Sequence, residues 1–145
     1  MSKIIATTTV TIQFLCAGYL VLSGPVLVRH PLGLAVQIGG ILLGLWAIAA
    51  MQIGNFNITP TVRQDARMVT AGPYRYIRHP MYAALLLATF PLALAPFTVL
   101  RLLGWVTLLV TLLVKLSYEE KWLCDKFEAY GEYQAVSKRL IPFVF

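Results

Sequence analysis

Two groups of polar residues in this 145-residue chain combine the side-chain types that bind a charged ligand. One group lies within residues 72–82, just before a long apolar stretch, and the other is a pair of adjacent glutamates. The members expected to come within reach of each other are Arg78, His79, Tyr82, Glu119 and Glu120. The first three can donate hydrogen bonds to a carboxylate, and the two glutamates can accept them from an ammonium group. Together they would suit a zwitterionic ligand such as an amino-acid moiety.

Pro80 predicts where the first group stands relative to a helix. Proline suits the first helical position, where its missing N–H costs nothing, so His79 would precede a helix N-terminus. The partial positive charge at such a terminus favours an anion. Each residue alone has a simpler interpretation, because Arg and Tyr often anchor proteins at membrane interfaces and paired glutamates outside a span are usually solvated. The gathering of several polar types at one helix end is what favours a ligand site.

The composition indicates which elements position these groups. Hydrophobic residues make up 59% of the chain and charged residues 12%, and the mean hydropathy is +0.74, outside the range of soluble domains. Long stretches without charge predict membrane-spanning helices, since a crossing needs about 20 residues. We expect a single all-α domain over residues 1–145, a polytopic membrane protein with four transmembrane helices. The expected spans are residues 4–28, 32–53, 80–95 and 99–115.

The last two expected spans form a tight helical hairpin, because Pro91 and Arg101 interrupt the apolar block and indicate a turn near residues 95–100. Each arm of about 16 residues is about 24 Å long, which is short for a hydrocarbon core of about 30 Å. Such a hairpin would bring the two polar groups together at one end. Beyond Lys115, helical spacing of apolar residues predicts that the helix continues as an amphipathic interfacial segment and ends near Gly131.

The formal net charge of +6 predicts the orientation of the helices rather than a nucleic-acid partner. Ten of the 12 Lys and Arg residues fall on the side of the N-terminus, the connection after the second span and the C-terminal segment. Because basic residues gather on the cytoplasmic side, both termini should be cytoplasmic, in what we expect to be a prokaryotic cell membrane. Cys16 and Cys124 are expected to be free thiols, and no metal-ligand spacing surrounds them.

The chain contains a second copy of the Arg-His-Pro tripeptide, Arg29-His30-Pro31. Gly33 stands at the position that corresponds to Tyr82, and the expected topology places this copy on the opposite side of the membrane. We interpret it as a turn with an anchoring arginine.

The two polar groups and their surroundings resemble the isoprenylcysteine carboxyl methyltransferase family, to which the phospholipid N-methyltransferases are similar. The resemblance covers about residues 60–145. It rests on Val69-Thr70-Ala71-Gly72-Pro73-Tyr74, Arg78-His79-Pro80-Met81-Tyr82, Glu119-Glu120, Leu123, Phe127, Tyr130, Tyr133 and Pro142.

The resemblance implies a membrane methyltransferase that binds S-adenosylmethionine at the cytoplasmic side, between the two polar groups. The cofactor contacts that it implies are Tyr74, His79, Tyr82, Glu119 and Glu120. The catalytic residues that it implies are Arg78, Glu119 and Glu120. Lys115, one helical turn before Glu119, would hold an anionic group of the acceptor. The implied partner is a lipophilic small molecule or a lipid, which would enter from the bilayer while the polar cofactor enters from the cytoplasm.

Two positions depart from the family pattern. Ala84 stands where the family often has glycine, which we expect to narrow the space for a ligand slightly. Glu128 follows Phe127 where glycine is usual, so the C-terminal surface helix is expected to run further than in relatives. Both departures bear on the fit of the acceptor more than on cofactor binding.

The acceptor atom and two other functions stay open at this point. Methyl transfer to a carboxylate or thiolate needs little acid–base help, whereas an amine requires a base, for which Glu119 or Glu120 are the first candidates. The alternative enzyme is an NADPH-dependent membrane reductase acting on a sterol-like lipid, which shares the Arg-His-Pro-x-Tyr stretch but would need a phosphate-binding loop. The remaining alternative is a non-catalytic membrane protein that retains the fold.

Overall fold

The structure is a computed structural model that describes residues 3–51 and 69–145. The described chain is all-α, with five α-helices and one short 3-10 helix. The elements are α1 (Lys3–Leu22), α2 (Pro31–Met51), η1 (Gly72–Arg75), α3 (Pro80–Leu94), α4 (Val99–Lys126) and α5 (Tyr130–Val136).

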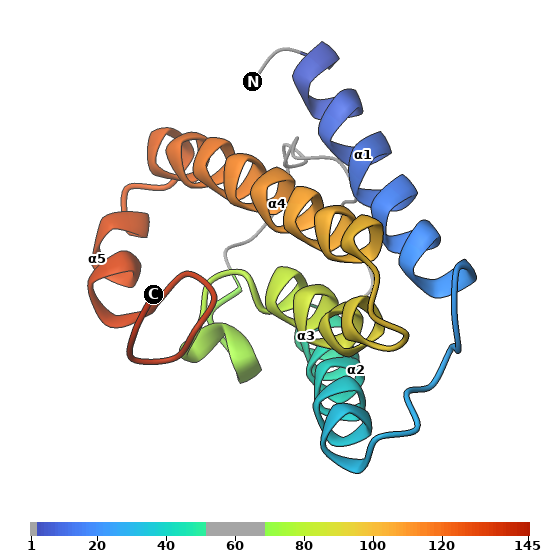
Figure 1. The fold of residues 1–145 in the computed structure, drawn as a ribbon. Helices are drawn as coiled ribbons and strands as arrows, with labels where there is room; N and C mark the ends of the chain where they lie inside the picture. Colours follow the sequence, from blue (N-terminus) through green and yellow to red (C-terminus); the bar gives the residue numbers. More distant parts are fainter. Residues whose placement is uncertain (1–2, 52–68) are drawn as a thin grey trace.

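The four long helices pack as two pairs. α2 lies against α3 and α1 lies against α4, while α3 and α4 form an antiparallel hairpin that joins the pairs (Figure 1). Beyond α4 the chain turns through α5, and its C-terminal segment loops back beside η1 (Figure 1). The C-terminal end of α4 therefore lies near the N-terminal end of α3, as the predicted hairpin requires.

Three helices are long and apolar enough to cross a membrane, namely α1, α2 and α4. Only a minority of each apolar stretch is buried, and large side chains such as Leu15, Leu42 and Leu103 are exposed. Such surfaces are stable against lipid rather than water, and the protein is a multi-pass integral membrane protein. The prediction of four full spans is confirmed only in part, because α3 has 15 residues and is about 22 Å long.

Helix boundaries differ from the predicted spans at two places. The first helix ends at Leu22 rather than near residue 28, because Gly24 weakens a helix and Pro25 cannot continue it. The last two residues of the predicted span 32–53 lie outside the described residues, and so does the start of the region 60–145 that the resemblance covers and predicts to be the catalytic half. The turn of the hairpin lies where it was predicted, between Leu94 and Val99.

Pro91 and Arg101 do not break the hairpin arms as the sequence suggested. α3 continues through Pro91 for another three residues. Arg101 lies in the first turn of α4 and is 2% exposed, with its guanidinium donating to the carbonyls of Leu92 and Leu20 and to the Ser23 hydroxyl. It therefore holds the end of α1 against the hairpin instead of reaching a lipid surface.

α4 continues beyond its apolar part as predicted, but it ends earlier than predicted. The helix stops at Lys126, and Phe127 has an extended backbone (φ −120°, ψ 111°). Gly131 lies inside α5 and is not the helix end, and Glu128 lies in the break rather than extending the surface helix. The chain turns here because Tyr130 and Tyr133 are buried on the rest of the molecule, which a straight helix would not allow.

The contact between α2 and α3 depends on Gly40. A Cβ atom at Gly40 would lie 2.5 Å from the Ala88 nitrogen and 2.9 Å from the Ala84 oxygen, so only glycine permits this approach. Ala84 is buried in this helix contact, with its Cβ 3.4 Å from the position of a Cβ on Gly44. The expectation that Ala84 narrows a ligand space is therefore wrong, since its side chain faces α2.

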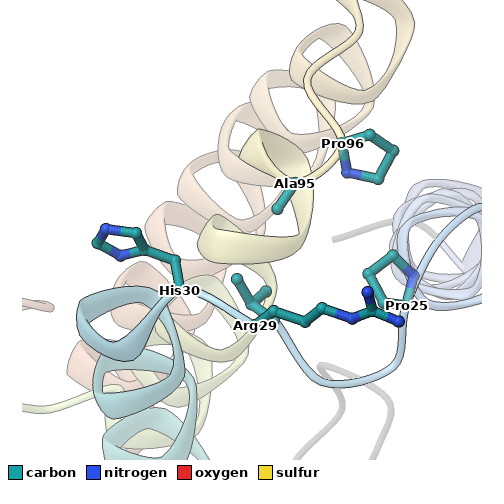
Figure 2. A pocket seen from close by; sticks show the side chains of 6 residues that line it. Pro25, Arg29, His30, Ala95 and Pro96 are labelled. Carbon is teal, nitrogen blue, oxygen red and sulfur yellow. The ribbon is translucent and has the colours of Figure 1, made fainter.

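The first Arg-His-Pro tripeptide lies at the end of the bundle opposite to the second. A cavity at that end is lined by Pro25, Val28, Arg29, His30, Ala95 and Pro96. The Arg29 side chain extends toward Pro25, and the His30 ring points the other way (Figure 2). Both side chains are exposed.

Candidate functional site

The two polar groups predicted from the sequence lie together. Pro80 is the first residue of α3, so Arg78 and His79 stand at its N-terminal end. Glu119 and Glu120 belong to the last part of α4, which the hairpin brings alongside. The structure thus joins residues about forty positions apart in the sequence.

Glu120 lies between two arginines. Arg78 Nε donates to Glu120 Oε1 at 2.8 Å, and Arg139 Nε donates to Oε2 at 3.0 Å. The side chains of Arg78 and Glu120 are 9% and 5% exposed. Arg78 also donates to the carbonyl oxygens of Ser137 and, at 3.3 Å, Gln134. A buried carboxylate with two such partners is compensated in charge and in hydrogen bonds.

The C-terminal segment completes this part of the site. The Arg78 amide donates to the Lys138 carbonyl at 2.7 Å, and the Lys138 amide donates to the Tyr76 carbonyl at 3.0 Å. The His79 amide donates to the Arg139 carbonyl at 3.1 Å. Arg139 was not among the predicted site residues, because its only signal in the sequence is the basic pair Lys138-Arg139 before the apolar residues 140–145.

Glu119 has different neighbours. The Tyr82 hydroxyl donates to Glu119 Oε1 at 2.6 Å, and His79 Nδ1 lies 3.7 Å from Glu119 Oε2. The rings of His79 and Tyr82 are parallel, with centroids 5.4 Å apart. Among the described residues, Glu119 Oε2 has no hydrogen-bond donor within normal distance. Glu119 therefore keeps an acceptor for a ligand, whereas both oxygens of Glu120 are occupied.

Two buried polar atoms in this region have no hydrogen-bond partner in the described chain. They are His79 Nε2, which approaches Glu120 Oε1 at 3.4 Å without forming a hydrogen bond, and the Tyr130 hydroxyl. Unsatisfied buried polar atoms are rare in proteins and call for an explanation such as a missing ligand. A polar ligand with donors and acceptors would satisfy them.

Tyr74 lies near enough to Glu119 and Tyr82 to interact with them electrostatically, but its direct contacts are with other residues. Its hydroxyl faces the Met51 sulfur at 4.0 Å, and its carbonyl accepts a hydrogen bond from the Tyr133 hydroxyl at 2.5 Å. Burial raises the pKa of Tyr74 and Tyr130, and it raises the pKa of Tyr133 to about 12. All three hydroxyls are therefore protonated at neutral pH and can donate hydrogen bonds.

Lys115 lies next to the cluster, on the side of α1. Its side chain is buried, its ammonium nitrogen donates to Gln13 Oε1 at 3.1 Å, and it lies 5.1 Å from the centre of the Tyr82 ring. Lys115 thus lies near Tyr82, and its role as a residue that binds the acceptor stays a prediction. Gln13 was missed, since a single glutamine in an apolar helix carries no spacing signal.

The side chains in this region fit S-adenosylmethionine, the cofactor that the resemblance implies. A carboxylate with a free acceptor atom suits an ammonium, and the helix N-terminus with His79 and nearby tyrosine hydroxyls suits a carboxylate. The unpartnered atoms of His79 and Tyr130 are further positions for polar contacts. S-adenosylmethionine carries all of these groups.

Comparison with known proteins agrees with this chemistry. The phospholipid methyltransferase family matches residues 28–130, which include α2, α3, α4 and the whole of the ionic cluster except Arg139. The match is to this family rather than to the related isoprenylcysteine carboxyl methyltransferases. No curated protein matches the chain. The match supports methyl transfer over the reductase and the non-catalytic alternatives. The chain belongs to the phospholipid methyltransferase family and is a membrane enzyme that uses S-adenosylmethionine to methylate a lipid acceptor.

Proposed function

We propose that methyl transfer takes place where the N-terminal end of α3 meets the last part of α4. The observation that supports this place is the partly buried group of His79, Tyr82 and Glu119, which has a histidine nitrogen without a hydrogen bond and a carboxylate oxygen without a donor among the described residues. The residues proposed to contact the cofactor are Tyr74, His79, Tyr82 and Glu119, and Glu120 is proposed to hold them in place. When bound there, S-adenosylmethionine supplies an electrophilic methyl group on its sulfonium.

The two glutamates have different proposed roles. Glu120 is held by Arg78 and Arg139 on both oxygens, so it positions the backbone and side chains around the ligand. Glu119 touches the ligand, because its Oε2 can accept a hydrogen bond from an ammonium group. If the acceptor is an amine, Glu119 is also the base that takes its proton. Arg78 supports the site by fixing Glu120, and the catalytic role is concentrated in Glu119.

The acceptor is proposed to reach the site from the bilayer. Large exposed apolar side chains on α1 and α4 place lipid beside Lys115, which would hold an anionic part of the acceptor. Positioning and exclusion of water supply most of the catalysis when the nucleophile is a carboxylate or thiolate. Because the sequence also resembles the isoprenylcysteine carboxyl methyltransferases, the proposed methyl-accepting group is either an amine or a carboxylate.

The end of the bundle that carries the site is proposed to face the cytoplasm. Ten of 12 basic residues were assigned to this side from the sequence, and cytoplasmic loops are enriched in Lys and Arg. This orientation would give the site access to soluble S-adenosylmethionine. Labelling of single cysteines introduced at Ser117 and at Ser23 in intact cells tests it, and access of an impermeant reagent to position 117 would contradict it.

Ligand-dependent stability of the purified protein tests the cofactor site. In neutral detergent, S-adenosylhomocysteine at about 100 times its dissociation constant should add about 2.7 kcal/mol to the free energy of unfolding. Glu119→Gln should lose most of this gain without a lower melting temperature in the absence of ligand. The exposed Glu132→Gln is the matched control and should keep the full gain.

Three outcomes would contradict the proposal. They are stabilisation of the wild type by NADPH instead of S-adenosylhomocysteine, no stabilisation by either, and an undiminished gain in Glu119→Gln. Incubation of membranes with S-adenosylmethionine labelled in its methyl group then identifies the acceptor and its reacting atom.

A further inference from the structure

Residues 141–145 form a tight loop that presents apolar side chains to the surroundings, and we call it the apolar loop. Ile141, Phe143 and Val144 are 54%, 85% and 75% exposed. The loop is closed by its own backbone, because the Ile141 amide donates to the Phe145 carbonyl at 2.7 Å and the Phe145 amide donates to the Ile141 carbonyl at 3.1 Å. It therefore has a defined shape with its apolar side chains outside.

The conformation of Phe143 is unfavourable in water for two reasons. Its φ is 65°, in the left-handed region that residues with a bulky side chain rarely adopt. The same residue is also the most exposed of the three apolar residues. Strained and exposed apolar groups of this kind are maintained where a partner takes up the side chain.

The apolar loop is fixed to the proposed site by the residues that precede it. Leu140 is 7% exposed and belongs to the same hydrophobic core as Ile77. Arg139 Nε donates to Glu120 Oε2 at 3.0 Å, and the guanidinium carbon of Arg139 lies 5.5 Å from the centre of the Phe145 ring. Arg139 thus contacts the apolar loop on one side and the carboxylate of the site on the other.

The same attachment determines the level of the apolar loop relative to the bilayer. The carbonyls of Lys138 and Arg139 accept hydrogen bonds from the amides of Arg78 and His79, directly before the start of α3 at Pro80. Because α3 is apolar from its first residue onward, its start marks the boundary between hydrocarbon and headgroups. A loop that is bound at this boundary lies within reach of the headgroups.

The charges beside the apolar loop are positive. Arg75, Tyr76 and Lys138 are exposed, and the Lys138 amide donates to the Tyr76 carbonyl at 3.0 Å. Neither residues 69–80 nor residues 137–145 include an acidic residue. Basic and aromatic side chains next to exposed apolar ones are typical of surfaces that bind the interface of an anionic bilayer.

We propose that the apolar loop is an interfacial membrane-binding surface, which inserts Ile141, Phe143 and Val144 among the headgroups of an anionic bilayer. The lipid that it contacts is the surrounding bilayer and not the methyl acceptor. Its seating in the bilayer holds Arg139 against Glu120, so the site is complete only when the loop is inserted. This consequence rests on the proposed function, whereas the membrane contact itself does not.

The depth of a spin label tests the membrane contact. The label is attached to Phe143→Cys, in a protein whose Cys16 and Cys124 are replaced by alanine, in nanodiscs of phosphatidylcholine and phosphatidylglycerol. Oxygen concentrates in lipid and a nickel chelate stays in water, so the ratio of their collision rates with the label reports depth. The ratio should be severalfold higher at position 143 than at Glu132→Cys, on the exposed side of α5, and lower than at Leu103→Cys in α4.

Two results would overturn the membrane contact. Equal ratios at positions 143 and 132 would place the apolar loop in water. Low collision rates with both reagents at position 143 would show that protein covers it, such as a second copy of this chain. The ratio at position 143 should also fall when phosphatidylcholine replaces the anionic lipid, and an unchanged ratio would overturn the role of the basic residues.

A double-mutant cycle tests whether the loop holds Arg139 in place. Phe143→Asp puts a charge into the apolar loop, and aspartate adopts a left-handed φ more readily than phenylalanine, so backbone strain does not increase. Arg139→Gln removes the ion pair with Glu120. Each change should lower the melting temperature in anionic nanodiscs, and the fall caused by Phe143→Asp should be about half or less in the Arg139→Gln background.

Gly131→Asp is the matched control for the added charge, since position 131 is exposed and has open space for a side chain. It should leave the melting temperature unchanged. Fully additive falls in the cycle would overturn the link between the loop and Arg139. An absent response of the wild type to S-adenosylhomocysteine would overturn the proposed function and leave the depth result intact.

Discussion

The two Arg-His-Pro tripeptides of this protein have the same local sequence and very different surroundings. In both, the proline is the first residue of a helix, Pro31 in α2 and Pro80 in α3. Arg29 and His30 are exposed beside a cavity, whereas the side chains of Arg78 and His79 are 9% and 7% exposed.

The difference comes from the element that faces each tripeptide. α4 presents two carboxylates to the second copy, while the first copy meets the turn between α3 and α4, which offers Ala95 and Pro96. A buried guanidinium needs a partner for its charge, so only the second copy can be buried. A tripeptide of this kind therefore indicates a helix start by itself and a ligand site only with acids from another helix.

Removing the carboxylate of Glu120 should lower the stability of the protein more than any other change. Glu120→Ala leaves the guanidinium of Arg78 buried without its carboxylate, which costs about 3–5 kcal/mol. The melting temperature in detergent should fall by about 6 °C or more. The exposed Glu132→Ala should leave it unchanged. A Glu120→Ala protein as stable as the wild type would show that the acid is not what separates the two tripeptides.

Replacing the arginine of each tripeptide by lysine should have the next largest effect, and only the change at Arg78 should lower activity. Arg78→Lys cannot reproduce the contacts of Arg78 with Glu120 and the Ser137 carbonyl together, because lysine lacks the planar fork of donors. We expect methyl transfer to fall by about tenfold, the equivalent of about 1.4 kcal/mol. Arg29→Lys should leave activity and stability within about 0.5 kcal/mol of the wild type. Equal losses in the two variants would contradict a special role for the second tripeptide.

Replacing His79 should change stability less than removing Glu120, and it separates ligand binding from folding. His79→Phe keeps a ring to pack against Tyr82 and removes the unpartnered Nε2 atom. Stability without ligand should therefore stay within about 1 kcal/mol of the wild type, since no native hydrogen bond of Nε2 is lost. The gain from S-adenosylhomocysteine should shrink, whereas His30→Phe should retain it. A full gain in His79→Phe would remove this nitrogen from the site.

Sequence reasoning predicted the meeting of the two polar groups because one short turn determines it. Once α3 and α4 are joined by a few residues, the residues before α3 and those late in α4 have to be neighbours. The all-α membrane fold followed from hydropathy in the same way. The lengths of the helices did not follow from hydropathy alone. The apolar stretch continues past Gly24 and Pro25, whereas the first helix ends before them.

The parts that were missed depend on contacts over long separations. Arg139 reaches Glu120 because the backbone near Lys138 pairs with Tyr76 and Arg78, and no local pattern predicts that pairing. The sequence did not predict that the side chain of Ala84 faces α2, because that depends on the close packing of α2 against α3. The different environments of Glu119 and Glu120 are likewise a product of packing, since the two residues are adjacent and identical in type.

The ion pairs around Glu120 have a consequence for the order of biosynthesis. Arg78 is made 42 residues before Glu120, and Arg139 is made 19 residues after it. At about 5–20 residues per second, Arg78 waits about 2–8 seconds for its carboxylate while α3 and α4 enter the membrane. During that interval its charge has to remain at the lipid headgroups or in water. The site therefore assembles late, after the ribosome has passed residue 139, and its maturation follows insertion of the helices instead of accompanying it.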